Sequence, residues 1–176
     1  MLVKICIIEG SVYRNGDGTM QRIANLLVLK DNHVLLLKKP RRGWYVAPGG
    51  KVNPGESIYE AAVREFTEET GTTPITPHLK GTYTMVIQDE KEQIVKDEWM
   101  LFTFIAYDLQ GTPFEKTIEG ELEWHPVENL QTLPMAEGDR TNLLFAVSNQ
   151  GMQYGTFTYT EQFQLLSERI QNSEEG

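Results

Sequence analysis

Cysteine is nearly absent from this sequence, and so are long hydrophobic runs. Among 176 residues there is one cysteine, Cys6, which lies in the apolar run from Ile5 to Ile8 and is predicted to be a packed core thiol. A single cysteine provides no intramolecular disulfide, which favours a reducing, cytoplasmic setting. The N-terminus has no signal-peptide stretch, and no apolar run approaches the roughly 20 residues that cross a membrane. We therefore expect a soluble protein without a membrane partner.

Histidine and positive charge are also scarce. The three histidines share no metal-ligand spacing, and the formal net charge is −9. This balance opposes long-range attraction to polymeric DNA or to anionic membranes, although a small polyphosphate arrives with its own divalent cations. Positive charge is concentrated in the run from Lys38 to Arg42. That run is either a place that attracts phosphates or a solubilising surface turn.

Local signals predict a helix from about Ser57 to Thr70. Ser57 and Glu60 have the S-x-x-E form of a capping box. Gly71 stands where a helix C-terminus favours a residue that tolerates positive φ.

Three glutamates of this helix fall on or beside its apolar stripe instead of on a solvent face. At roughly 100° per residue, Glu65 and Glu69 lie beside or inside the stripe, and Glu68 lies at its border. A solvated helix with an Arg64–Glu68 ion pair is the alternative. However, these carboxylates repel one another, and burying even one costs several kcal/mol unless positive charge compensates. A divalent cation would do so, and oxygen ligands without histidine or cysteine favour Mg²⁺, with Mn²⁺ as a substitute, over zinc.

A glycine loop precedes the helix. Pro48, Gly49, Gly50 and Lys51 are predicted to form a tight strand-to-helix connection, in which the glycines let backbone groups approach a ligand closely. Lys51 lacks both the upstream glycine spacing and the following Ser or Thr of a Walker loop, so a P-loop NTPase is not indicated.

The loop and the helix together carry a specific spacing. From Gly50 to Thr72 the residues follow G-x5-E-x7-R-E-U-x-E-E-x-G-U, where U is normally a bulky apolar residue. Its seven fixed identities would match by chance about once in 10⁸ starting points. The segment closely resembles the Nudix box, the signature of the Nudix hydrolases, although Phe66 and Thr72 are atypical at its apolar positions.

This resemblance implies an α/β fold, the Nudix α/β/α sandwich with a mixed β-sheet, and a Mg²⁺-dependent enzyme. Members of the family cleave nucleoside diphosphates linked to another moiety, by attack of water on phosphorus. By resemblance, the metal ligands are the Gly49 carbonyl, Glu65, Glu68 and Glu69, the residue that orients Glu68 is Arg64, and the supporting residues are Gly50 and Glu56.

In this family one further carboxylate outside the box usually joins the metals or acts as a base. Glu119 is the candidate, because the segment from Glu119 to Trp124 resembles the one that carries this acid in a subfamily acting on oxidised guanine nucleotides. Glu121 is the fallback, and a plain surface charge is the alternative for Glu119.

The resemblance to that subfamily, the MutT-like 8-oxo-dGTP diphosphatases, covers most of the chain. It implies hydrolysis of an ordinary or oxidised guanine (deoxy)nucleoside triphosphate to the monophosphate and pyrophosphate. A base-stacking tryptophan and a base-reading asparagine found in other members are replaced by Ala136 and Val46. Guanosine alarmones, nucleoside diphosphate sugars and RNA 5′ ends remain open as substrates, as does a catalytically silent nucleotide sensor.

Several residues are candidates for binding the substrate. Guanine presents N1–H and N2–H₂ donors, so the acidic loop from Glu137 to Asp139 is placed to accept from them, with Asp139 the stronger choice. The alternative role of Asp139 is the N-cap of the following helix. The substrate-binding candidates are Lys51, Arg42, Tyr45, Glu137 and Asp139.

The whole chain is predicted to form one domain over residues 1–171, followed by a disordered acidic tail over residues 172–176. A second helix should start near Asp139, and we expect a monomer or homodimer that binds a small nucleotide. Strands are expected at Arg22 to Lys30, Val34 to Lys39, Trp44 to Ala47, Gly81 to Gln88, Trp99 to Tyr107, Glu121 to Pro126 and Met152 to Tyr159.

Overall fold

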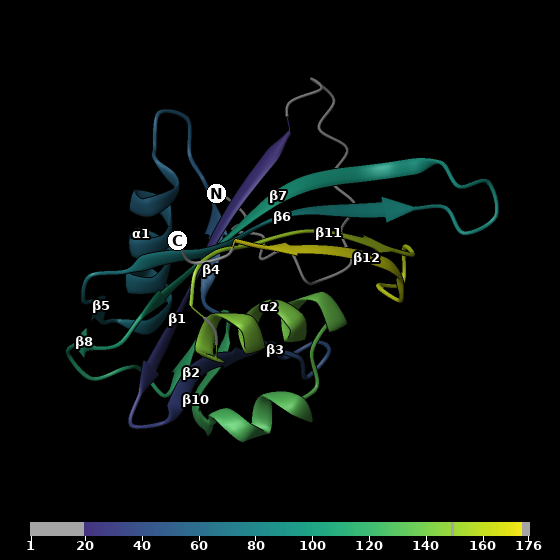
Figure 1. Ribbon diagram of the computed structural model, residues 1–176. Helices are drawn as coiled ribbons and strands as arrows, with labels where there is room; N and C mark the ends of the chain where they lie inside the picture. Colours follow the sequence, from purple (N-terminus) through teal and green to yellow (C-terminus); the bar gives the residue numbers. More distant parts are fainter. Residues whose placement is uncertain (1–19, 149, 174–176) are drawn as a thin grey trace.

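The computed structural model describes residues 20–148 and 150–173, in which helices lie on both sides of a large sheet (Figure 1). Cys6 and its apolar run lie outside the described residues. In chain order the elements are β1 (Gln21–Lys30), β2 (His33–Lys38), β3 (Tyr45–Val46), β4 (Gly49–Lys51), α1 (Ile58–Thr70), β5 (Thr73–Pro74), β6 (His78–Gln88), β7 (Val95–Ala106), β8 (Leu109–Gln110), β9 (Lys116–Thr117), β10 (Gly120–Pro126), the 3₁₀ helix η1 (Val127–Gln131), α2 (Glu137–Ser148), β11 (Gln153–Tyr159) and β12 (Leu165–Asn172).

The large sheet is mixed. Its 10 strands follow the order β12-β11-β6-β7-β1-β2-β10-β9, with β3 paired to β2 and β4 paired to β1. β1 is parallel to β7 and β11 is parallel to β6, whereas β6–β7, β2–β10 and β11–β12 are antiparallel pairs. β5 and β8 form a separate 2-stranded sheet. The mixed sheet confirms the predicted fold class.

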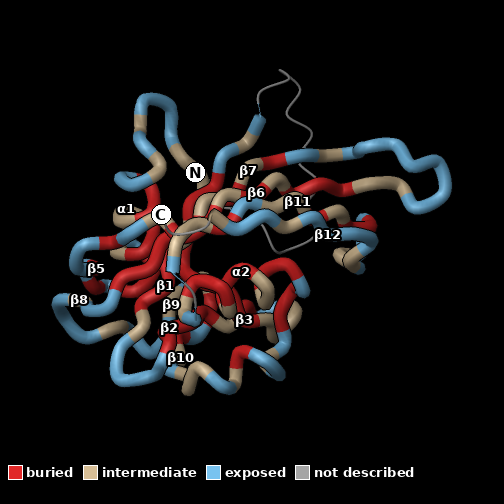
Figure 2. Tube along the Cα trace, in the orientation of Figure 1, coloured by how far each residue is buried: buried red, intermediate tan, exposed pale blue. Residues whose placement is uncertain are grey.

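Strand β1 contributes to the core on both faces of the sheet. Side chains alternate along a strand, so Leu26 and Val28 pack with Phe66 of α1, whereas Leu27 packs with Leu143 of α2. Figure 2 shows the buried residues gathered on the central strands and on the helix faces that cover them. The two helices therefore form the outer layers of an α/β/α sandwich, and α1 brings its glutamates to the face that it shares with β1 and β4.

The second helix differs from its prediction at one important residue. α2 begins at Glu137, which places Asp139 inside its first turn, so the interpretation of Asp139 as an N-cap is wrong. No helix within residues 20–148 and 150–173 has the length and apolar content needed to span a membrane.

The C-terminal segment also differs from its prediction. Asn172 is the last residue of β12, and the Oγ of Ser173 accepts a hydrogen bond of 2.8 Å from the Met152 backbone N–H. The predicted tail therefore starts too early, because β12 is held by backbone pairing with β11 and needs no apolar periodicity of its own. Residues 174–176 lie outside the described residues.

Candidate active site

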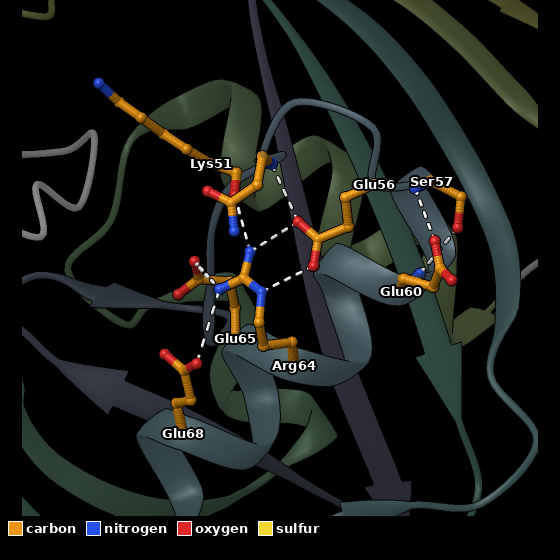
Figure 3. Close-up of polar contacts among 8 residues, drawn as sticks. Lys51, Glu56, Ser57, Glu60, Arg64, Glu65 and Glu68 are labelled. Carbon is orange, nitrogen blue, oxygen red and sulfur yellow. Dashed lines mark hydrogen bonds and ion pairs between the residues drawn. The ribbon is translucent and has the colours of Figure 1, made fainter.

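Helix α1 begins and ends at defined caps, which fix its place beside the glycine loop. The Ser57 backbone N–H donates to Oε2 of Glu60 at 2.8 Å, and the Glu60 backbone N–H donates to Oγ of Ser57 at 3.1 Å (Figure 3). Gly71 takes the left-handed conformation at the other end, with φ of 74°. These contacts confirm the predicted capping box and C-terminus.

Arg64 connects the helix glutamates with the glycine loop (Figure 3). Its Nε and Nη2 donate to the two carboxylate oxygens of Glu56 at 2.7 and 2.9 Å. Nη1 donates to Oε1 of Glu65 at 2.6 Å, and Nη2 donates to the Lys51 carbonyl at 3.0 Å. Oε1 of Glu68 is more distant, 3.8 Å from Nη1. Arg64 is therefore bound mainly to Glu56 and Glu65, and its expected hold on Glu68 is the weakest of these contacts.

Both members of the Arg64–Glu56 pair are held in their charged forms. The guanidinium hydrogen bonds lower the pKa of Glu56, and the same hydrogen bonds raise the pKa of Arg64. Glu56 also accepts a hydrogen bond of 2.9 Å from the Asn53 backbone N–H. Both carboxylate oxygens of Glu56 thus accept hydrogen bonds, from Arg64 and from the loop at Asn53.

Two of the three glutamates expected to bind metal are buried. Glu65 is 8% and Glu69 is 5% exposed, whereas Glu68 is exposed. Oε2 of Glu69 accepts a hydrogen bond of 2.8 Å from the Gly49 backbone N–H. Burial raises the pKa of Glu69 to about 7, although the charge of Lys39 and the Gly49 hydrogen bond oppose this rise. A buried carboxylate whose negative charge is disfavoured is well suited to a site that receives a cation.

The glycines of the loop allow very close packing. A Cβ on Gly50 would stand 2.5 Å from Cδ of Glu65, and a Cβ on Gly49 would stand 2.5 Å from Cα of Asn25. Gly49 is also the register partner of Asn25 in the β1–β4 pair. A side chain at either glycine would therefore displace the Glu65 carboxylate or strand β1.

The donor chemistry of this region fits a hard divalent cation, because carboxylate and carbonyl oxygens are the groups that Mg²⁺ prefers. Among the residues that the structure describes, no three His, Cys, Asp or Glu side chains converge as they would around a bound ion. Glu65 is instead bonded to Arg64, and Glu69 is bonded to Gly49. Each of these two hydrogen bonds uses one carboxylate oxygen, Oε1 of Glu65 and Oε2 of Glu69.

Glu119 lies in the turn between β9 and β10, where its Oε2 is 3.2 Å from Nζ of Lys39. Its charge contributes to the raised pKa of Glu69, so it acts at short range on the α1 cluster. The side chain of Glu121 is 51% exposed and pairs with Lys116 at 3.3 Å. These positions support Glu119 over Glu121. Lys39 was not predicted to be near the site, since nothing local in the sequence distinguishes one buried lysine within a basic run.

An apolar pocket opens beside the glycine loop. Val46 and Ala136 both line it. Trp99 and Phe163 supply aromatic walls, and Asp139 supplies a carboxyl group. Burial raises the pKa of Asp139 to about 7. The pocket thus combines apolar walls with one acidic group, a combination common in ligand sites.

Arg42 and Lys51, two of the predicted substrate-binding residues, lie near different parts of this site. The guanidinium of Arg42 lies 5.1 Å from the ring centroids of Trp44 and Phe163, and Phe163 belongs to the pocket wall. Lys51 gives its carbonyl to Arg64, while its side chain extends away from the cluster (Figure 3). Arg42 is thus close to the pocket, and Lys51 is next to the carboxylates through its backbone.

Of the five substrate-binding candidates only Asp139 lines the pocket, and the side chains of Tyr45 and Glu137 have other partners. Tyr45 is 6% exposed, and its hydroxyl donates to Oε2 of Glu123 at 2.8 Å. The side chain of Glu137 is 60% exposed and lies 3.5 Å from Nε of Arg140. These contacts engage both side chains with partners outside the pocket.

Comparison with known proteins adds independent findings. The NUDIX domain family matches residues 19–144 of the chain. A protein of Bacillus subtilis, described as the uncharacterized Nudix hydrolase YvcI, is 48% identical over 151 residues, which are 86% of this chain and 94% of that protein. The crystal structure of a mutator MutT protein from Bacillus halodurans is 48% identical, with a TM-score of 0.82 over 86% of this chain and 97% of that chain. An ADP-ribose pyrophosphatase of Methanocaldococcus jannaschii is 37% identical over 78 residues, which are 43% of this chain and 46% of that protein.

Proposed function

Because the chain belongs to the Nudix hydrolase family and acts on the phosphoanhydride bonds of nucleotides, we propose that its substrate is a guanine (deoxy)nucleoside triphosphate, ordinary or oxidised. The products would be the monophosphate and pyrophosphate, and the divalent cation would be Mg²⁺. The proposed metal ligands are Gly49, Glu65, Glu68, Glu69 and Glu119, all within a single domain.

The position of Asp139 carries the choice of base. Its carboxyl group stands in the wall of an otherwise largely apolar pocket that is also lined by Gly49 and Gly50. Guanine presents N1–H and N2–H₂ side by side, and one carboxylate accepts from both. Adenine, cytosine and uracil present no such pair of adjacent donor groups. Since burial disfavours the ionised form of Asp139, these donors would supply the stabilisation that the pocket lacks.

The site residues divide the chemical work. A divalent cation held by Glu65, Glu68 and Glu69 would neutralise the phosphate oxygens that otherwise repel a nucleophile. Arg64 fixes the Glu65 carboxylate through its hydrogen bond of 2.6 Å. Glu119, the further carboxylate outside the box, would join this cation as an additional oxygen ligand.

A nucleoside diphosphate sugar is the second candidate substrate. It is supported by the similarity to an ADP-ribose pyrophosphatase over 43% of the chain. The adenine of ADP-ribose would offer Asp139 a single amino group. We therefore rank a nucleoside diphosphate sugar below a guanine nucleotide as the substrate. A silent nucleotide sensor ranks lower still, because all three glutamates expected to bind metal are present.

The test is hydrolysis of a nucleotide panel with Mg²⁺, containing dGTP, 8-oxo-dGTP, dATP, dCTP and ADP-ribose, with the products separated by ion-exchange chromatography. We expect the highest kcat/KM for a guanine triphosphate and release of pyrophosphate. A higher kcat/KM for ADP-ribose would overturn the choice of substrate.

The same assay tests the metal site. EDTA should abolish turnover, and Glu65→Gln, Glu68→Gln and Glu69→Gln should each lower kcat by at least about 10²-fold, the usual cost of one group that stabilises transition-state charge. The variants should remain folded, because each change removes repulsion between carboxylates. Full activity in two of the three variants would refute the assigned site.

A further inference from the structure

Lys39 is a buried cation that lies outside the Nudix box. The residue is 2% exposed, and its Nζ lies 3.2 Å from Oε2 of Glu119, whose side chain is 18% exposed. The preceding residue differs, because the side chain of Lys38 is 40% exposed and its Nζ lies 3.8 Å from Glu123. Two adjacent lysines thus have unlike surroundings, and Lys39 alone is paired with a carboxylate of the proposed metal site.

The backbone on both sides of the Lys39–Glu119 pair is anchored. The Lys39 N–H donates to the Trp44 carbonyl at 2.8 Å, and the Lys39 carbonyl accepts from the Gly43 N–H at 2.9 Å. In the β9–β10 turn, the Glu119 N–H donates to Oγ1 of Thr117 at 3.1 Å. A change of partner by rotation of the Glu119 side chain would leave these backbone hydrogen bonds in place.

Both members of the pair act on the α1 cluster. Burial is the main cause of the raised pKa of Glu69, while the charge of Lys39 lowers that pKa and the charge of Glu119 raises it. Glu119 is thus paired with the Lys39 ammonium, and its charge opposes ionisation of Glu69.

We propose that Lys39 is a positioning residue that competes with the divalent cation for Glu119. This inference rests on the proposed function, because it takes Glu119 as a ligand of that cation. The ammonium compensates a carboxylate charge that would otherwise add to the repulsion around Glu69. A cation that recruits Glu119 must break this pair and then lie close to a second positive charge. Lys39 therefore weakens cation binding and raises the Mg²⁺ concentration at which Glu119 joins the site.

Direct binding of Mn²⁺ in the absence of nucleotide tests this role. The electron paramagnetic resonance signal of free Mn²⁺ reports binding, so the measurement does not depend on turnover. Lys39→Met keeps an apolar stem and removes the charge, and we expect it to tighten Mn²⁺ binding by about tenfold. Lys38→Met is the matched control, and its effect should stay within about twofold because an exposed charge is screened.

A double-mutant cycle shows whether Lys39 acts through Glu119. Glu119→Gln alone should weaken Mn²⁺ binding. In that background Lys39→Met should tighten binding much less than in the parent, because the carboxylate for which the ammonium competes is gone. Unchanged or weaker binding in Lys39→Met overturns the proposal. Equal tightening in both backgrounds also overturns it, because Lys39 would then act without Glu119.

Circular dichroism confirms that each variant is folded before binding is compared. If Lys39→Met does not fold, Lys39→Gln replaces it, since glutamine keeps a hydrogen-bond donor without the charge, and the same direction is expected. If Glu119→Gln changes neither Mn²⁺ binding nor turnover, the role given to Glu119 in the proposed function is wrong, and the competition fails with it. If Glu119→Gln weakens binding but removal of the Lys39 charge does not tighten it, only the role of Lys39 is wrong.

Discussion

Asp139 links stability to substrate recognition through its pKa. Burial raises that pKa from 3.8 to about 7. Between these values the unfolded chain has lost a proton that the folded protein retains, so stability falls as the pH rises. The difference between the two pKa values corresponds to about 4 kcal/mol at most. This penalty is absent below pH 3.8 and complete above about pH 7.

Asp139→Asn removes this titration and keeps the shape of the side chain. From about pH 5 to about pH 8, the parent should lose up to about 3 kcal/mol of unfolding free energy that the variant does not lose. The pKa of Glu69 is also raised to about 7, but Glu69 titrates in both proteins and cancels in the difference. Urea unfolding at several pH values measures the effect. A parent–variant difference that changes by less than about 0.5 kcal/mol across this range would refute the buried-acid interpretation.

Asp139→Ala tests recognition of the base. The loss of a charge-assisted hydrogen bond should raise KM for guanine nucleotides by about 10- to 100-fold, equivalent to about 1.5 to 3 kcal/mol. Pyrimidine nucleotides should be little affected, because they lack the paired donors. An unaltered guanine preference would remove Asp139 from the substrate site even if the stability result holds.

The remaining predictions concern the metal site and its support. Glu119→Gln should depress kcat by at least about tenfold with a modest change in KM, whereas Glu121→Gln should do little in the same steady-state assay; the reverse ranking transfers the role to Glu121. Gly50→Ala should lower kcat/KM by at least about tenfold, because the new Cβ would stand 2.5 Å from Cδ of Glu65; a fully active variant contradicts that close packing. Glu56→Gln should lower the unfolding free energy by about 1 to 3 kcal/mol at neutral pH, since a charged hydrogen-bond partner of the guanidinium is lost. The pKa of Glu56 is lowered from 4.5 in the folded protein. The loss of stability in Glu56→Gln should therefore disappear as the pH falls below 4.5 and through the pKa of Glu56 in the folded protein. A loss of stability that urea unfolding shows to be independent of pH would contradict this prediction.

The Nudix box was predictable because its information is local. A helix has a fixed angular spacing, so the order of residues alone placed Glu65 and Glu69 on a buried face. The caps depend only on near neighbours, and the structure has both, at Ser57 and Gly71. Residue types that favour strands likewise predicted a strand from Arg22 to Lys30, and the structure has it at Gln21–Lys30.

Strand β12 shows where that local information ended. Its burial pattern has no buried positions, and residues such as Glu168 and Arg169 are polar. Backbone hydrogen bonds to β11 hold it in the sheet, and those bonds leave little mark on side-chain pattern. The sequence therefore indicated a disordered tail from residue 172, where the structure continues the strand.

The sequence by itself determined the fold class, the family resemblance and the glutamates of the box, because each depends on short-range spacing. Only the tertiary structure decided the partners of the charged groups. Lys39 and Glu119 are 80 residues apart in the chain and 3.2 Å apart in space. Asp139 comes from the first turn of α2, yet its raised pKa follows from burial beside residues of distant strands. The free energy of a charge depends on everything that surrounds it, and those surroundings exist only once the helices and the sheet have packed.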